Sequence, residues 1–137
     1  LRENRYDPAA GVVTIEVEPQ PGVQYTIDFV GTLAGTSPDG EIVKAGDSGE
    51  NVAEVRKYSP EIGRVLSSVR DIKATYRLTG KELYVRAVVR SDKRLAYPIS
   101  GDLTEERAWC QPVGWKRRLV RSKSHSDAVP ASLRGPW

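Results

Sequence analysis

Alternation of apolar and polar residues, the period of a β-strand, is the feature that most constrains the fold of this chain. It is clearest in Val12–Val17 and Gln24–Val30, which are separated by a turn at Pro19–Gly22. Side chains two residues apart on a strand point to the same face, so each segment predicts a strand with one buried side. The positions expected to face the core are Val13, Ile15, Val17, Tyr25, Ile27 and Phe29.

A β-hairpin is predicted over Lys73–Arg90. If Gly80-Lys81 is a two-residue loop, the apolar residues of both flanking strands fall on one side, and a shift of one residue would destroy this match. The expected cross-strand neighbours are Ala74 with Ala87, Tyr76 with Val85, and Leu78 with Leu83. The opposite face, expected to meet solvent or a partner, carries Thr75, Arg77, Tyr84 and Arg86.

One short helix is predicted after the polar segment Gly35–Lys57. Ser59-Pro60-Glu61 has the composition of a helix start, and apolar residues follow it at helical spacing through Val69. The polar segment is long for a loop without structure, so short strands are expected at Glu41–Lys44 and Asn51–Lys57.

Arg107–Trp115 is predicted to be an edge strand, or a strand interrupted at Pro112, because proline has no N–H group to donate to a neighbouring strand. Many strands, one helix and no alternation of the two favour a mainly β fold, an antiparallel, immunoglobulin-like β-sandwich. The predicted organisation is a sandwich domain over residues 1–115 and an extended tail over 116–137.

The predicted tail is basic, whereas the rest of the chain is slightly acidic. Residues 116–137 hold six basic residues and one acid, a net charge of +5, which leaves −2 for the first 115 residues of a chain whose total is +3. We expect the tail to dock on another chain by charge and by an apolar anchor at its end. The expected partner-binding residues are Lys116, Arg117, Arg118, Arg121, Lys123, Leu133 and Trp137.

Nucleic acid is a less favoured partner for this tail, because only Trp115 adjoins the basic run as a stacking group. No run of about 18 apolar residues is present, so no transmembrane segment is expected.

Few residues are available for catalysis. The chain has one histidine, His125, and one cysteine, Cys110, so His-bearing triads and cysteine-rich metal sites lack their members. A triad fragment at His125 and Asp127 is less plausible than a solvated tail. The carboxylate pairs, Glu16 with Glu18 and Glu105 with Glu106, are interpreted as solvent-facing charge. A calcium site in the polar segment does not fit the EF-hand spacing; its candidate ligands would be Asp39, Glu41, Asp47 and Glu50.

Four segments carry a family resemblance: Gln24–Thr32, Tyr58–Leu66, Tyr76–Val89 and Glu106–Val113. Over about residues 12–115 the chain resembles the C-terminal β-sandwich-like region of exported bacterial proteins whose N-terminal part is a PHP-type metal-dependent phosphoesterase-like domain. In that family the metal ligands belong to the N-terminal domain, so no catalytic residue is carried over. Cys110 stands where the family pattern has a threonine. The resemblance implies an exported protein, periplasmic or extracellular.

These observations predict a non-catalytic accessory domain, with no cofactor and no metal, that docks onto a larger protein or assembly as a structural subunit. Two alternatives remain. One is a carbohydrate- or ligand-binding module that uses exposed Tyr84 and a tryptophan. The other is an accessory domain cut from a phosphoesterase-like enzyme; the start at Leu1 suggests a processed product or a piece of a longer chain.

Overall fold

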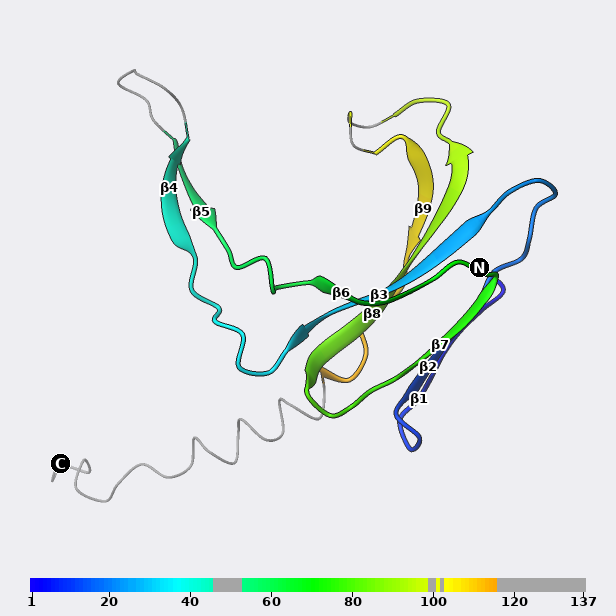
Figure 1. The fold of residues 1–137 in the computed structure, drawn as a ribbon, viewed down its shortest axis with the longest axis horizontal. Helices are drawn as coiled ribbons and strands as arrows, with labels where there is room; N and C mark the ends of the chain where they lie inside the picture. Colours follow the sequence, from blue (N-terminus) through cyan, green and yellow to red (C-terminus); the bar gives the residue numbers. More distant parts are fainter. Residues whose placement is uncertain (46–52, 99–100, 102, 116–137) are drawn as a thin grey trace, which may run out of the picture.

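A computed structural model describes residues 1–45, 53–98, 101 and 103–115, and its described elements are all β-strands (Figure 1). The strands are β1 (Glu3–Asp7), β2 (Val12–Glu16), β3 (Tyr25–Leu33), β4 (Glu41–Ala45), β5 (Ala53–Lys57), β6 (Arg64–Val69), β7 (Lys73–Arg77), β8 (Glu82–Arg94) and β9 (Glu105–Trp109). The predicted mainly β class is confirmed. None of the described residues forms a helix that is long and apolar enough to cross a membrane.

The strands form three antiparallel sheets. The order is β1-β2-β7 in a three-stranded sheet, β6-β3-β8-β9 in a four-stranded sheet, and β4-β5 in a two-stranded hairpin. In Figure 1 this hairpin, coloured cyan to green, projects away from the other strands. β2 and β3 lie where the alternation predicts them, and β4 and β5 confirm the two short strands of the polar segment.

Side chains of the two larger sheets share one hydrophobic core. Ile15 of the three-stranded sheet and Ile27, Phe29 and Val85 of the four-stranded sheet are fully buried within it. The Phe29 and Tyr76 rings, one from each sheet, stack with their centres 5.4 Å apart. Because apolar burial contributes about 25 cal/mol per Å² removed from water, this core is the main source of stability that joins the sheets.

The predicted short helix is wrong. The Ser59 hydroxyl accepts a hydrogen bond from the Glu61 N–H (3.2 Å), but the chain makes only a turn there. Gly63 then takes a left-handed φ of 68°, and the following residues form strand β6. Residues 64–69 contain two valines and two serines, which favour a strand or are poor helix formers, so pairing with β3 prevails over the local start signal.

The predicted hairpin at Gly80-Lys81 is also wrong. β7 pairs with β2 and β8 pairs with β3, so the two strands lie in different sheets and Tyr76 and Val85 are not neighbours in one ladder. Both residues nevertheless contribute to the common core, as their alternation predicts.

The crossing between these two sheets is held by main-chain hydrogen bonds on either side and by one carboxylate. The Leu78 N–H donates to the Gly11 carbonyl (2.8 Å), and the Ala34 N–H donates to the Lys81 carbonyl (2.7 Å). The buried Glu82 carboxylate accepts hydrogen bonds from Thr79 and Gly80 at the corner itself. We call Leu78–Glu82 the crossing corner.

The predicted edge strand is confirmed as β9, the outermost strand beside β8. After β9 the chain continues along β8, where the Cys110 main-chain N–H donates to the Ala87 carbonyl (2.9 Å). Val113 then exchanges two main-chain hydrogen bonds with Val85 (2.8 and 3.0 Å). The break between these contacts falls at Gln111-Pro112, as the missing proline donor requires.

Candidate docking surface

The outer face of the four-stranded sheet is the side turned away from the core. Residues opposite one another in antiparallel register point to the same face, and Ile27 and Phe29 point inward. The alternate positions therefore point outward. They include Val65 on β6, Asp28 and Val30 on β3, Arg86, Val88 and Arg90 on β8, and Arg107 and Trp109 on β9.

Six of these residues form what we call the arginine–tryptophan face: Val65, Arg86, Val88, Arg90, Arg107 and Trp109. Val65 and Trp109 are 56% and 55% exposed, although both belong to paired strands. Trp109 lies opposite Val88, and Arg107 lies opposite Arg90. Tryptophan and arginine beside aliphatic residues are the composition enriched in the centres of protein interfaces.

Asp28 anchors one side of this face beneath its surface. This buried carboxylate accepts a hydrogen bond from the Ser68 hydroxyl (2.6 Å) with one oxygen and from Arg90 Nε (2.7 Å) with the other. The hydrogen bond to Asp28 and its charge raise the pKa of Arg90. Asp28 thus neutralises Arg90 and has both oxygens engaged.

The other two arginines of the face have no such partner. Among the described residues, none forms a hydrogen bond or ion pair with the side chain of Arg86, which is exposed, or with that of Arg107. Arg107 Nε is buried and has no hydrogen-bond acceptor there. An unsatisfied buried donor costs about 1–3 kcal/mol, so an acceptor brought by a partner would be favourable at this position.

The outer face of the three-stranded sheet differs in kind. Its central acid, Glu16, forms ion pairs with Arg2 (3.6 Å) and Lys73 (3.4 Å), and Arg5 pairs with Glu3 (3.4 Å). Three ion pairs thus join charges of both signs on this face, as on an ordinary solvated surface, although Arg77 has no ion-pair partner among the described residues. The exposed Val65 and Trp109, and the Arg107 Nε that has no acceptor among the described residues, lie on the opposite side of the core.

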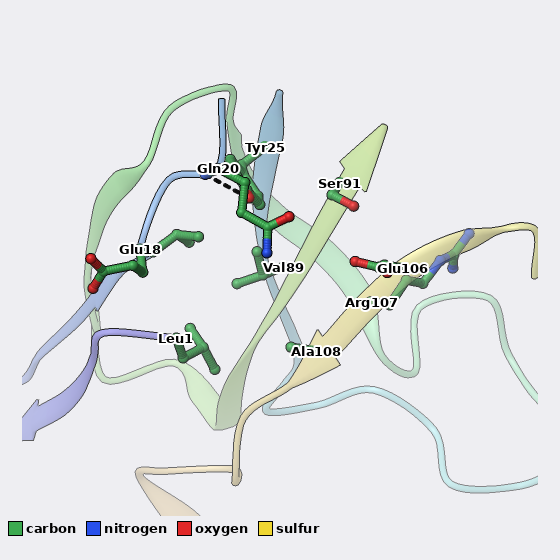
Figure 2. A pocket seen from close by; sticks show the side chains of 10 residues that line it. Leu1, Glu18, Gln20, Tyr25, Val89, Ser91, Glu106, Arg107 and Ala108 are labelled. Carbon is green, nitrogen blue, oxygen red and sulfur yellow. Dashed lines mark hydrogen bonds between the residues drawn. The ribbon is translucent and has the colours of Figure 1, made fainter. Parts of the chain in front are cut away.

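A pocket of about 190 Å³ lies beside β3, β8 and β9. The side chains that line it are drawn in Figure 2. The Gln20 N–H donates to the Tyr25 hydroxyl there (3.3 Å). The Glu106 side chain points toward the pocket and pairs with Lys93 (3.2 Å), whereas the Arg107 guanidinium points away. The pocket is smaller than the roughly 300–1,000 Å³ of typical ligand sites. We assign no ligand to it.

A second pocket, of about 710 Å³, lies between β1 and the residues after β9. Its lining is mainly apolar, and the described residues that form it carry no formal charge: Tyr6, Pro8, Gln111, Pro112, Val113, Gly114 and Trp115. No charged side chain of the described residues lines this pocket to select a ligand by its charge, in contrast with the arginine–tryptophan face.

Most site residues expected from the sequence lie outside the described residues. This holds for Lys116, Arg117, Arg118, Arg121, Lys123, Leu133 and Trp137 of the tail, for His125 and Asp127, and for Asp47 and Glu50. Within the described part of the chain, no three His, Cys, Asp or Glu residues are grouped as metal ligands. Burial raises the pKa of the Cys110 thiol, which disfavours the reactive thiolate.

Tyr84 and Arg86 do lie on an outer face, as the alternation predicts, but Thr75 and Arg77 lie on the outer face of the other sheet. Tyr84 is half-buried, and its hydroxyl lies 3.3 Å from the Thr32 hydroxyl, within hydrogen-bond distance. Arg107 and Trp109 join Arg86 only through the pairing of β9 with β8, which no local pattern announces.

Asp28→Asn tests whether this network is structural. The substitution keeps the size but removes the charge that neutralises Arg90, and we expect a loss of about 1–3 kcal/mol in unfolding free energy. Urea denaturation measures it. The matched control is Asp92→Asn, because Asp92 is exposed near the end of β8 and, among the described residues, accepts a hydrogen bond only from the Gln24 N–H (2.9 Å). Equal effects of the two substitutions would contradict a special role for Asp28.

Comparisons with known proteins do not add to this geometry. A scan of family models and searches of curated proteins and of solved structures find no match to the chain.

Proposed function

We propose that this chain is a non-catalytic accessory domain that docks onto a larger protein or assembly as a structural subunit. The observation that carries the proposal is the contrast between the two outer faces. One carries three ion pairs and no large exposed apolar side chain of its strands, and the other exposes Val65 and Trp109 beside Arg86 and Arg107, whose side chains form no ion pair with the described residues. The finer fold class, an immunoglobulin-like sandwich with the two larger sheets as its layers, is part of this proposal.

The use of the buried carboxylates supports a structural role. Asp28 and Glu82 are buried, and each accepts several hydrogen bonds from neighbouring side chains or main-chain groups. A general acid or base needs a carboxylate that can reach a substrate. Both of these are committed to holding strands together instead.

The basic tail supplies a second contact in this proposal. Its net charge of +5 beside a slightly acidic domain suits a segment that reaches an acidic surface on another chain. The resemblance to the accessory region of exported PHP-type proteins supports the accessory role, and the exported location is proposed on that ground alone. The carbohydrate-binding alternative is weaker, because half-buried Tyr84 lies within hydrogen-bond distance of Thr32.

The size of the particle that contains this chain in its native cells tests the proposal. The tagged full chain should sediment well above its 15.1 kDa mass, in fixed ratio with another protein. Trp109→Ser should shift at least half of it to the free form, because a central interface tryptophan is worth about 2 kcal/mol or more.

The control is Arg77→Ala, which changes an exposed outer residue on the other sheet and should leave the particle unchanged. A free monomer in the wild type would contradict the proposal. An unchanged complex in Trp109→Ser would remove the docking role from this face.

A further inference from the structure

We infer that the arginine–tryptophan face binds an extended, acidic segment of a partner protein, with carboxylates four residues apart and an apolar side chain midway between them. This inference rests on the proposed docking function and specifies the chemistry of the partner. It is argued from the spacing of the face, its unpaired charges and its central apolar residues.

The spacing follows from strand geometry. Arg86, Val88 and Arg90 follow one another at every second residue of β8, so they point to the same side at intervals of about 6.6 Å. Trp109 lies beside Val88, and Arg107 lies beside Arg90. The face therefore presents positive charge, an apolar centre and positive charge again over about 13 Å. An extended segment laid along β8 has the same repeat.

The charges select carboxylates. Arg90 already donates to Asp28. Among the described residues, the side chains of Arg86 and Arg107 have no hydrogen-bond acceptor. A guanidinium binds a carboxylate with two parallel hydrogen bonds, which gives both strength and orientation. A first carboxylate of the segment would meet Arg86, and the second, four residues on, would meet Arg107.

The centre selects an apolar side chain. Trp109 is 55% exposed, whereas its neighbour Val88 is 9% exposed, so the exposed indole lies beside a buried aliphatic side chain. An aliphatic side chain between the two carboxylates would pack against both and exclude water from the flanking ion pairs. Charge pairs shielded from water in this way are stronger than exposed ones.

Other occupants fit less well. The basic tail carries +5 and is repelled by two unpaired arginines. A nucleic acid needs many phosphate contacts, whereas this face offers two unpaired cations and one largely exposed aromatic on a domain of net charge −2. A neutral segment would offer Arg107 only carbonyl oxygens, whose hydrogen bonds are weaker than those of a carboxylate.

Binding of three capped peptides to the ¹⁵N-labelled full chain tests the inference. The probe is Ser-Glu-Ser-Leu-Ser-Glu-Ser, and its comparators carry Gln or Lys in place of both Glu residues. NMR signals of the arginine Nε–H and tryptophan indole groups report the site. We expect the Glu peptide to shift the signals of Arg86, Arg107 and Trp109, with binding that weakens as salt rises.

Arg86→Ala and Arg107→Ala should each weaken binding of the Glu peptide at least about tenfold, whereas Arg77→Ala should not change it. Arg107→Lys keeps the positive charge but loses the planar guanidinium that binds a carboxylate with two hydrogen bonds, so this variant should bind with intermediate affinity. It replaces Arg107→Ala in the test if that variant does not fold.

Equal binding of the Gln and Glu peptides would overturn the acidic partner while leaving the docking face intact. If the Glu peptide shifts none of the NMR signals at this face, the inference is overturned as well. The docking function is then tested separately by the sedimentation of the Trp109→Ser variant. Tighter binding of a ten-nucleotide oligothymidine at the same signals would overturn it in favour of nucleic acid. Self-association through these residues would overturn it in favour of a second copy.

Discussion

Gly31→Ala should destabilise the fold by about 3 kcal/mol or more, at the upper end of the cost of overpacking. Gly31 lies on β3 between Val85 of β8 and Arg64 of β6, where the sheet is fully paired. A Cβ at this position would overlap the main-chain carbonyl oxygen of Tyr84 and approach Leu66 Cδ1 to 2.9 Å. Leu66 can turn aside, but the carbonyl belongs to the central strand pair and cannot move without breaking the ladder.

Thermal unfolding measures this cost, and a decrease of about 10 °C in Tm is expected for a domain of this size. Gly101→Ala is the control, because an added Cβ there meets nothing within 4 Å. Neither residue has a left-handed φ, so the comparison isolates the effect of space from that of backbone strain. A Gly31→Ala variant as stable as Gly101→Ala would show that the sheet can separate locally at β3.

Sequence reasoning recovered most of the strands because their alternation is a local property. Val13 and Ile15, like Ile27 and Phe29, are buried as predicted, since a residue on a half-buried strand shows its face through its own pattern. Pairing is not local in this sense. The alternation at Tyr76 and Val85 identifies the core-facing side of each strand, but it holds equally for one hairpin and for two strands in different sheets.

The helix prediction failed for a related reason. Ser59-Pro60-Glu61 is a good start for a helix, and Leu66 and Val69 do pack against the core. Val65, however, is 56% exposed on the opposite side, which is what a strand produces and a helix with the same spacing would not. Residues 64–69 form a strand because they pair with the edge of β3. No pattern within residues 59–69 indicates that this edge is available for pairing.

The candidate surface was predictable only in part. Tyr84 and Arg86 were expected to face solvent or a partner from β8 alone. Arg107 and Trp109 come 21 positions after Arg86 and Val88 in the chain and join them through the pairing of β9 with β8, and Val65 joins from the opposite edge of the sheet. A surface assembled from three strands appears only when the strand order is known.

Glu82→Ala should destabilise the fold by about 3 kcal/mol through the crossing corner. Glu82 is 4% exposed, and its carboxylate accepts hydrogen bonds from the Tyr76 hydroxyl (2.8 Å) and from the N–H groups of Thr79 (3.0 Å) and Gly80 (3.1 Å). Removing the acceptor leaves these donors without their partner, which costs about 1–3 kcal/mol for each buried group and less for the exposed ones. Urea denaturation measures the loss.

The same contacts predict how this contribution depends on pH. Burial raises the pKa of Glu82, but the hydrogen bonds from Tyr76 and Thr79 outweigh it, so the pKa lies below its ordinary value of 4.5. A carboxylate with a lowered pKa in the folded state stabilises the fold above the ordinary value. That stabilisation is lost as the pH falls through the lowered pKa. Burial and the hydrogen bond to Glu82 together raise the pKa of Tyr76 to about 12.

Glu82→Gln separates charge from shape, because the amide keeps the size and one acceptor but presents an NH₂ group to donors. Its deficit in unfolding free energy should be largest near pH 7 and should narrow as the pH falls below about 4.5, where the wild type becomes protonated as well. Glu18→Gln, at an exposed position, should show little deficit at any pH. A Glu82→Gln deficit that stayed constant from pH 7 to pH 3 would mean that packing, and not the carboxylate charge, holds the crossing corner between the two sheets.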